Sequence, residues 1–488
     1  MKFRNWFQFS ELGELVRRRS FLSLCVGPLA FFIILFAPFE LPGLEPQAKT
    51  FLAIFVWVAC QWLLTTVPMF MTGIMGVSLA CLFEISSPSQ ALAPFAHPII
   101  FLFLGGFLLA RAMEELGFDK KLSMLIISHP AVKGSFKKTF IAILVVTSFF
   151  SMWISNTATT AMMLPIMLGL LRSLDIKDQN LKSSLLIAMA YAATIGGLGT
   201  PMGSPPNIIA VGMLKEIADI TITFLDWMIM GIPLVLVSLF LLIMLVFKKI
   251  PRHILESPID VAALGKLYSS KFTFAEKIII ITFSTTVFFW FIPSIAGLIS
   301  PDSPVSDWMN RVLDPSIVVM LTVTPLFFLP FSGEKKILTS ESLKNIDWSS
   351  LLLFGSGLSL GGLLFSTGIA GLAGNTLIQT LESGHFYWAM VLVISATVFF
   401  TEFTSNTASA NILLPIVIAA TIQMGISPTG PSLMVALACN LAFMLPVATP
   451  PNAIVFGSGE VHFKDLLRWG LIMNIIGITL ISITLNFY

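Results

Sequence analysis

Charge is scarce in this chain of 488 residues. Only 11% of the residues are Asp, Glu, Lys or Arg, whereas 56% are hydrophobic and the mean hydropathy is +0.91. Soluble domains carry about 25% charged residues, so this composition excludes a soluble protein. The net charge of +2 excludes the basic field on which nucleic-acid binding depends. We therefore interpret the chain as an integral membrane protein.

Cysteine and histidine are also rare. The four cysteines lie in apolar runs without Cys-x-x-Cys spacing, which is typical of small buried side chains rather than of disulfides or metal ligands. The five histidines are scattered and follow no metal-binding pattern. Neither a histidine nor a paired carboxylate accompanies the serines at membrane depth, so an enzyme is not predicted.

Apolar runs with the length of a membrane helix fill most of the chain. Eleven of them predict membrane crossings: 21–39, 48–66, 68–86, 99–117, 183–218, 227–247, 275–297, 315–331, 350–369, 431–459 and 467–486. Two further stretches, 138–173 and 386–422, are roughly twice as long as one crossing requires and have polar residues at their centres. A re-entrant helical hairpin, which enters and leaves by the same face of the membrane, fits both stretches.

The distribution of basic residues supports this topology. With a cytoplasmic N-terminus, every Lys and Arg falls on the cytoplasmic side except Lys49, Lys215 and Arg311. Turning either hairpin into a full crossing would reverse every later loop and destroy this bias. We expect a multi-pass protein of a bacterial inner (plasma) membrane. The basic segments 119–138 and 251–275 are expected either along the inner surface or as solvated linkers.

The chain repeats itself at an offset of about 250 residues. The motif Ser155–Ala158 recurs as Ser405–Ala408, and Pro205–Asn207 recurs as Pro450–Asn452. In the predicted topology the hairpin at 138–173 opens to the cytoplasm, while the other opens outside, so the two copies are inverted. Inverted repeats with broken helices are typical of secondary transporters.

Both repeated motifs suit ion binding. Ser-Asn-Thr lies at each hairpin tip, where the second arm begins, and the free N–H groups of that helix end favour an anion. The hydroxyl and carbonyl oxygens at the same place suit sodium. The glycines and prolines between Thr194 and Pro206, and the segment Leu445–Asn452, predict broken helices with carbonyls free to bind cations.

Glu402 is the one acidic residue placed deep in the membrane, and its repeat mate is Met152. It is interpreted either as a proton or sodium site or as a hydrogen-bonded structural carboxylate. Helix ends neutralise a dianion only in part, so bound cations have to supply the remaining charge. This favours transport of an anion coupled to a cation.

At these motifs the sequence resembles the divalent anion/sodium symporter family, from about residue 48 onward. The resemblance implies an all-α polytopic membrane protein with eleven transmembrane helices and two re-entrant hairpins in two inverted repeats, which works by an elevator movement and forms a homodimer through its scaffold. The implied division is a cytoplasmic N-terminal segment 1–20, scaffold helices 21–137, a transport domain 138–250, a cytoplasmic linker 251–274, scaffold helices 275–385 and a transport domain 386–488.

The resemblance also assigns the binding residues. The first sodium site is implied to use Ser151, Ser155, Asn156 and Gly203, and the second Thr401, Thr404, Asn406 and Ala448. The substrate is implied to meet Asn156, Thr157, Ser204, Asn406, Thr407, Thr449 and Pro450. The repeat independently pairs Ser151 with Thr401, Gly203 with Ala448 and Ser204 with Thr449.

The resulting prediction is sodium-coupled symport of C4-dicarboxylates such as succinate, malate or fumarate. The coupling ion is Na⁺, and the partners are the dicarboxylate, sodium, the lipid bilayer and a second copy of the chain. The alternatives are a sodium-independent dicarboxylate exchanger of the same fold, or a carrier of citrate or sulfate. A passive channel is disfavoured because it needs a continuous polar lining, whereas these polar residues cluster at one level.

Overall fold

The computed structural model describes residues 25–41, 43–64, 67–132, 134–174, 176–258, 271–300, 303–332, 335–380 and 386–485. The predicted N-terminal segment 1–20 and half of the predicted linker, residues 259–270, lie outside these residues. Apart from one short two-stranded sheet, the described elements are helices, as the sequence predicts.

The first half of the chain begins with a helix over Cys25–Phe36. It continues with α2 (Pro46–Leu64), α3 (Met69–Leu82), α4 (Pro88–Leu92), η1 (Ala93–Ala96), α5 (Pro98–Glu115), α6 (Phe118–Ile127), α7 (Phe136–Ser151), α8 (Asn156–Ser173), α9 (Gln179–Gly196), η2 (Pro201–Gly203), α10 (Pro205–Ala218), α11 (Phe224–Phe247) and α12 (Arg252–Leu255).

The second half contains α14 (Phe274–Ile299), α15 (Pro304–Val312), α16 (Pro315–Val323), η3 (Thr324–Phe327), β1 (Pro330–Ser332), β2 (Lys335–Lys336), α17 (Ser340–Lys344), α18 (Trp348–Ser366) and α19 (Ile369–Thr380). It ends with α20 (Phe386–Thr401), α21 (Asn406–Gln423), α22 (Thr429–Cys439), α23 (Pro450–Gly457) and α24 (Phe463–Thr484). Strands β1 and β2 pair in antiparallel fashion.

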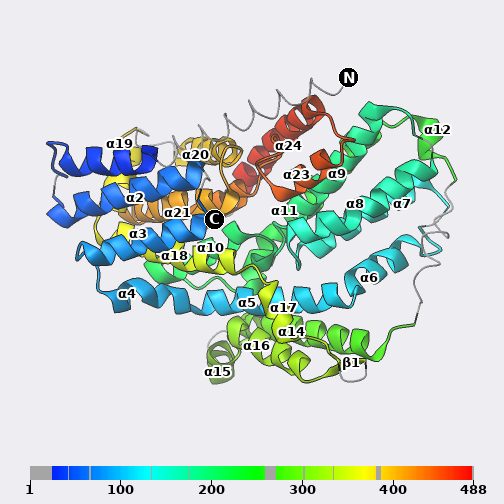
Figure 1. Ribbon diagram of the computed structural model, residues 1–488, viewed down its shortest axis with the longest axis horizontal. Coiled ribbons are helices and arrows are strands. Elements are labelled where there is room, and N and C mark those ends of the chain that lie inside the picture. Colours follow the sequence, from blue (N-terminus) through cyan, green and yellow to red (C-terminus); the bar gives the residue numbers. More distant parts are fainter. Residues whose placement is uncertain are drawn as a thin grey trace, which may run out of the picture.

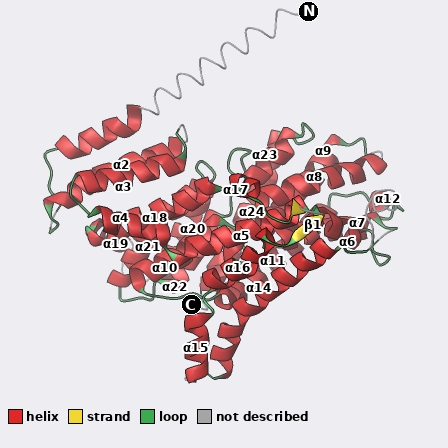
Figure 2. Ribbon diagram, turned by 60° about the horizontal axis from the view of Figure 1, so that its bottom comes forward, coloured by secondary structure: helices red, strands yellow, loops and turns green. Residues whose placement is uncertain are grey.

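The two polar-centred stretches fold as helix–turn–helix units. Helices α7 and α8 are joined by four residues, 152–155, and α20 and α21 are joined by 402–405. In Figures 1 and 2, α7 and α8 lie on the right, whereas α20 and α21 lie to the left of the centre, so the two units are on different sides of the molecule's middle. The predicted hairpins are therefore present as folded units, and their depth in a membrane stays a prediction.

Both predicted helix breaks are present. Helix α9 ends at Gly196, and α10 starts only at Pro205, with the 3-10 turn η2 between them. Helix α22 ends at Cys439, and α23 starts at Pro450. A double proline opens α10 and α23, at positions where a missing N–H leaves no hydrogen bond unmade.

The helices have the apolar character that a bilayer requires. Among the described residues, seven helices are long and apolar enough to cross a membrane, and five shorter apolar helices accompany them. Some elements were not predicted: α4 and η1, the amphipathic α15, and α19, which occupies a stretch expected to be a loop. These helices are short, and sequence hydropathy identifies only long apolar runs. The number of eleven crossings stays a prediction.

Polar side chains define where several long helices start. Thr223 with Asp226, and Thr273 with Glu276, form capping boxes at the starts of α11 and α14.

In Figure 2, α15 and the adjacent end of α14 stand out from the body of the molecule. Helix α6 occupies part of the segment predicted to be amphipathic, and its Lys121 forms a buried ion pair with Glu276, with Nζ 2.7 Å from Oε2.

Candidate functional site

The starts of four helices meet at one cavity of about 540 Å³. It is lined by the first residues of α8 and α21, at the two hairpin tips, and of α10 and α23, after the two helix breaks. All seven predicted substrate residues line it: Asn156, Thr157, Ser204, Asn406, Thr407, Thr449 and Pro450. The fold thus brings residues more than 290 positions apart in the chain, such as Asn156 and Thr449, to one space.

The two hairpin tips have the same local structure. Ser155 is the N-cap of α8, and its Oγ accepts a hydrogen bond from the N–H of Ala158 at 3.2 Å. Ser405 caps α21 in the same way, accepting from the N–H of Ala408 at 3.2 Å. Each cap satisfies one of the free N–H groups of the helix start, and the positive end of the helix dipole faces the cavity.

A hydroxyl on the first arm orients the asparagine of each tip. Ser151 Oγ donates to Asn156 Oδ1 at 2.5 Å, and Thr401 Oγ1 donates to Asn406 Oδ1 at 2.8 Å. Thr401 Oγ1 also lies 2.9 Å from the carbonyl oxygen of Cys439, so its single proton is shared between that carbonyl and Asn406. The structure therefore brings the predicted sodium ligands Ser151 and Asn156 together, and likewise Thr401 and Asn406.

Two predicted oxygen ligands of the first sodium site face the same small space. A Cβ added at Gly197 would lie 2.7 Å from Asn156 Oδ1 and 3.1 Å from the carbonyl oxygen of Gly203. Gly203 also lines the main cavity, as do Ser155 and, in the second copy, Ala448. The clustering of a carbonyl, an amide oxygen and hydroxyls suits a hard cation such as sodium.

Thr404 is not brought into this cluster. Its hydroxyl is buried and lies 3.5 Å from the carbonyl of Trp62 on α2, to which it donates. Its predicted role as a sodium ligand therefore stays a prediction that the observed orientation does not support.

In each copy the hairpin tip is hydrogen-bonded to the loop that interrupts the broken helix. We call these broken loops: 197–204 between α9 and α10, and 440–449 between α22 and α23. In the first copy, Thr200 Oγ1 donates to the carbonyl of Met152. In the second, Glu402 accepts from the N–H of Met444 at 2.8 Å and of Leu445 at 3.1 Å. Met152 and Glu402 are repeat mates at the offset of the hairpins.

Glu402 has a third donor, Asn474 Nδ2 at 2.7 Å, and its side chain is buried. Three hydrogen bonds to one carboxylate fit the structural interpretation of Glu402. A direct role in binding a proton or sodium has no comparable contact in its favour.

Three buried asparagines near the cavity were not assigned roles from the sequence. Asn207 Nδ2 donates to the carbonyls of Gly197 and Thr200, each at 2.8 Å, and so closes the first broken loop. Asn452 Nδ2 closes the second loop through the carbonyls of Ala442, Phe443 and Leu445, at 3.1–3.3 Å. The repeated Pro-Pro-Asn motif was the available signal for these two. Asn440 had no such signal, because its mate at the 245-residue offset is Ile195.

Three charged residues line the cavity: Arg111, Glu114 and Asp347. Arg111 is neutralised by Glu114, with Nη1 3.4 Å from Oε2, and by Glu115, with Nε 2.8 Å from Oε1. The helix starts, rather than a lysine or arginine, are therefore the positive groups available to an anion at the hairpin tips.

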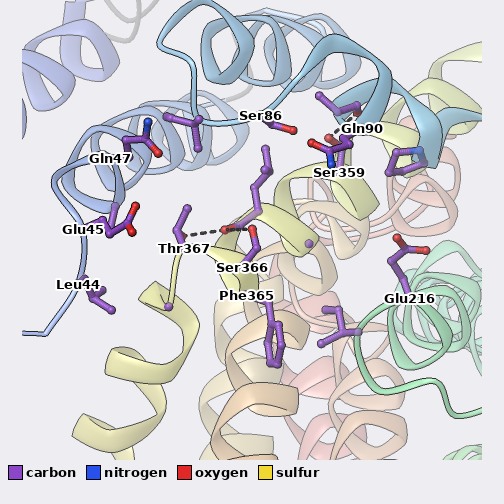
Figure 3. A pocket seen from close by; sticks show the side chains of 18 of the residues that line it. Leu44, Glu45, Gln47, Ser86, Gln90, Glu216, Ser359, Phe365, Ser366 and Thr367 are labelled. Carbon is purple, nitrogen blue, oxygen red and sulfur yellow. Dashed lines mark hydrogen bonds between the residues drawn. The ribbon is translucent and has the colours of Figure 1, made fainter.

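A larger cavity, of about 800 Å³, lies elsewhere and contains none of the predicted site residues. Figure 3 shows Glu45 and Gln47 on one side of it, Glu216 on the other, and Ser366 and Thr367 between them. Its described lining includes these two glutamates and no lysine or arginine, which disfavours a dianion. The smaller cavity is therefore the candidate binding site.

Comparison with known proteins identifies relatives over the whole chain. Residues 18–488 match the family described as "Sodium:sulfate symporter transmembrane region". An uncharacterized transporter of Haemophilus influenzae is 34% identical over 478 residues, covering 97% of this chain and 98% of that protein. A protein of Staphylococcus saprophyticus named sodium-dependent dicarboxylate transporter SdcS is 33% identical over 495 residues, covering 98% and 92%.

A solved structure shares the fold. The YdaH transporter of Alcanivorax borkumensis superposes with a TM-score of 0.54, covering 97% of each chain at 13% sequence identity. At this identity the likeness concerns the arrangement of helices alone.

Proposed function

The chain belongs to the sodium:sulfate symporter family, and from this premise we propose that it carries a divalent anion, a C4-dicarboxylate, together with sodium. The family is the divalent anion/sodium symporter family predicted from the sequence, so that prediction is confirmed, as is the prediction of a multi-pass membrane transporter rather than an enzyme. The SdcS relatives, which are named sodium-dependent dicarboxylate transporters, support the coupling ion and the substrate class.

The convergence of four helix starts on one cavity carries this proposal. The starts of α8 and α21 supply free N–H groups, and all four starts, including the proline-led α10 and α23, each direct roughly half a positive charge at the cavity, so together they favour a dianion. A linear dicarboxylate presents one carboxylate to each hairpin tip. The anion is held by Asn156, Thr157, Asn406, Thr407, Thr449 and Pro450, whereas Ser204 lines the cavity with its proton donated to Asn440.

Sodium completes the neutralisation of the anion. The first ion takes oxygen ligands from Ser151, Ser155, Asn156 and Gly203, and the second from Thr401, Asn406 and Ala448. Because each asparagine belongs to both a sodium site and the anion site, an empty sodium site leaves the asparagine less well oriented for the anion. This shared use of each asparagine couples sodium binding to anion binding.

We propose that the cavity moves together with the helices that line it. The hydroxyl of Tyr191 on α9 lies 2.7 Å from the carbonyl oxygen of Phe443 and 3.1 Å from that of Leu466, and its single shared proton links the first copy to the second. By contrast, α18 meets α21 through a glycine: a Cβ at Gly357 would lie 2.0 Å from Asn411 Oδ1. The two copies are thus hydrogen-bonded to each other, and the glycine on α18 offers little obstacle to sliding of α21. Both features support an elevator movement of 138–250 and 386–488 against the scaffold of 21–137 and 275–385.

Crosslinking tests this movement. Gly357→Cys combined with Asn411→Cys, oxidised in the membrane, is expected to stop uptake, and a reductant is expected to restore it. Each single variant is the matched control. Full uptake by a demonstrably crosslinked protein would show that α18 and α21 do not move past one another.

A homodimer through the scaffold is the assembly we propose. Exposed apolar side chains recur every seven residues along α14, at Phe274, Ile281, Phe288 and Ile295. Such a stripe suits a second helix as well as lipid. Light scattering of the detergent-solubilised protein should give a protein mass of twice 53.4 kDa, and a single chain mass would contradict the dimer.

Uptake by proteoliposomes tests the function. Labelled succinate is offered to vesicles with and without an inward sodium gradient, either empty or preloaded with unlabelled succinate. Uptake into empty vesicles that requires outside sodium is the expected result. Uptake that requires internal succinate and ignores sodium would identify an exchanger. Sulfate and citrate, offered in the same way, test the other anions, of which sulfate appears in the family's description.

A further inference from the structure

One buried amide links the broken loops of the two halves beside the cavity. Asn440, the residue that follows α22, is 1% exposed. Its Nδ2 donates to Asn207 Oδ1 at 2.8 Å and to the carbonyl of Ala436 at 2.9 Å, and its Oδ1 accepts from Ser204 Oγ. It therefore holds two residues that flank the double proline of the first half.

The direction of each hydrogen bond follows from chemistry. The carbonyl of Ala436 only accepts, so the nitrogen of Asn440 must face it. The nitrogen of Asn207 must likewise face the carbonyls of Gly197 and Thr200, which leaves its oxygen toward Asn440. Ser204 is then obliged to donate to Asn440 Oδ1.

This direction limits what Ser204 can do in the cavity. A hydroxyl has one proton, and that of Ser204 is given to Asn440. An ionised carboxylate only accepts, so this hydroxyl has no proton to offer it. Its oxygen lone pairs remain free to face a cation.

The second half of the molecule is an internal control. The mates of Ser204 and Asn207 are Thr449 and Asn452, and the mate of Asn440 is Ile195, which has no polar group. Accordingly, Thr449 Oγ1 and Asn452 Oδ1 are buried and have no hydrogen-bond partner within the described part of the chain. Thr449, which lines the cavity, therefore keeps its proton for an anion.

We propose that Asn440 is a positioning residue that fixes the first broken loop as a preformed half of the sodium site and withholds the Ser204 hydroxyl from the anion. This rests on the proposed function. The loop in question, 197–204, contains the carbonyl of Gly203, and Gly203 N–H donates to Thr200 Oγ1 at 3.0 Å. Asn440 thus acts on that carbonyl through Asn207 and Ser204, much as outer hydrogen bonds orient the ligands of a metal.

The test separates sodium from anion. Thermal unfolding of the purified protein in NaCl or choline chloride, without substrate, reports sodium binding, and succinate uptake at saturating sodium reports KM. Asn440→Ala and Ser204→Ala are each expected to raise the half-maximal sodium concentration by about 10-fold or more, with KM for succinate near the wild-type value. The double variant should be no worse than the single ones, because both changes break the same link.

Two comparators complete the design. Thr449→Val should show the opposite pattern, a raised KM for succinate with little change in sodium dependence. Ser432→Ala, which removes an unpartnered buried hydroxyl from the same helix α22, should behave as wild type. If Asn440→Ala does not fold, Ser204→Ala, which leaves the amide in place, carries the test.

The outcomes are distinct. A wild-type sodium response in Asn440→Ala or Ser204→Ala overturns the role of Asn440, as does a raised KM in Ser204→Ala that equals that of Thr449→Val. A wild-type protein that neither responds to sodium nor carries a divalent anion overturns the proposed function, and with it this role.

Discussion

Gly197 offers a sharp perturbation of the first sodium site. It has ordinary right-handed helical dihedral angles, with φ −56° and ψ −17°, so alanine fits the backbone and by itself causes no strain. The added methyl group, however, would lie 2.7 Å from Asn156 Oδ1 and 2.9 Å from its Nδ2. The equivalent position of the second half is Ala442, where a methyl group is already present.

The size of the effect follows from these distances. Ordinary contact begins at 3.4 Å, so Asn156 Oδ1 has to retreat by about 0.7 Å, and the Gly203 carbonyl, 3.1 Å away, is also pushed. Cation sites tolerate ligand shifts of only about 0.2 Å. Overpacking of this kind costs about 1–3 kcal/mol, which corresponds to roughly 5- to 150-fold in affinity.

We expect Gly197→Ala to raise the half-maximal sodium concentration about 10-fold or more, within that range. Sodium-dependent thermal stabilisation of the purified protein measures it, and uptake at increasing sodium confirms it. Gly457→Ala is the matched control, because a Cβ there meets nothing within 4 Å. A wild-type sodium response in Gly197→Ala would refute the assignment of Asn156 and Gly203 to one sodium site.

The remaining predictions concern the free energy of unfolding and test individual hydrogen bonds and one buried ion pair. Glu402→Gln places an amide nitrogen against backbone donors and should lower the free energy of unfolding by about 1.5–3 kcal/mol, seen as a lower Tm; an unchanged Tm would contradict the three hydrogen bonds. Tyr191→Phe should cost about 0.5–1.5 kcal/mol because it removes the one hydroxyl proton shared by the carbonyls of Phe443 and Leu466, also measured by thermal unfolding. Lys121→Met should cost about 3–5 kcal/mol because it leaves Glu276 buried and unpaired, and Lys121→Met combined with Glu276→Met should recover most of that loss; no recovery would show that the pair is not isolated.

Much of the fold could be predicted because the bilayer imposes simple rules on the sequence. Long apolar runs predicted α2, α11 and α24, and the glycines and prolines after Thr194 predicted the break before α10. The short helices α4, α15 and α19 could not be predicted in this way, since their lengths fall below what hydropathy detects. Their positions depend on packing against neighbours.

The candidate site was predictable to the extent that it repeats. Ser-Asn-Thr and Pro-Pro-Asn each occur twice, and all four copies reach one cavity. Asn440 occurs once, and its importance depends on contacts with Asn207 and Ser204, more than 230 residues away, which no spacing reveals. The orientation of Thr404 toward Trp62 is likewise a matter of packing.

Binding of labelled succinate to the purified protein tests most directly whether both hairpin tips and sodium form one site. Binding is measured in NaCl and in KCl for the wild type, Asn156→Ala and Asn406→Ala, with Met152→Ala as the control beside the first tip. We predict saturable binding that requires sodium, survives in Met152→Ala and is lost in both asparagine variants. Equal binding in KCl, or full binding by either asparagine variant, would contradict a single sodium-dependent site between the two tips.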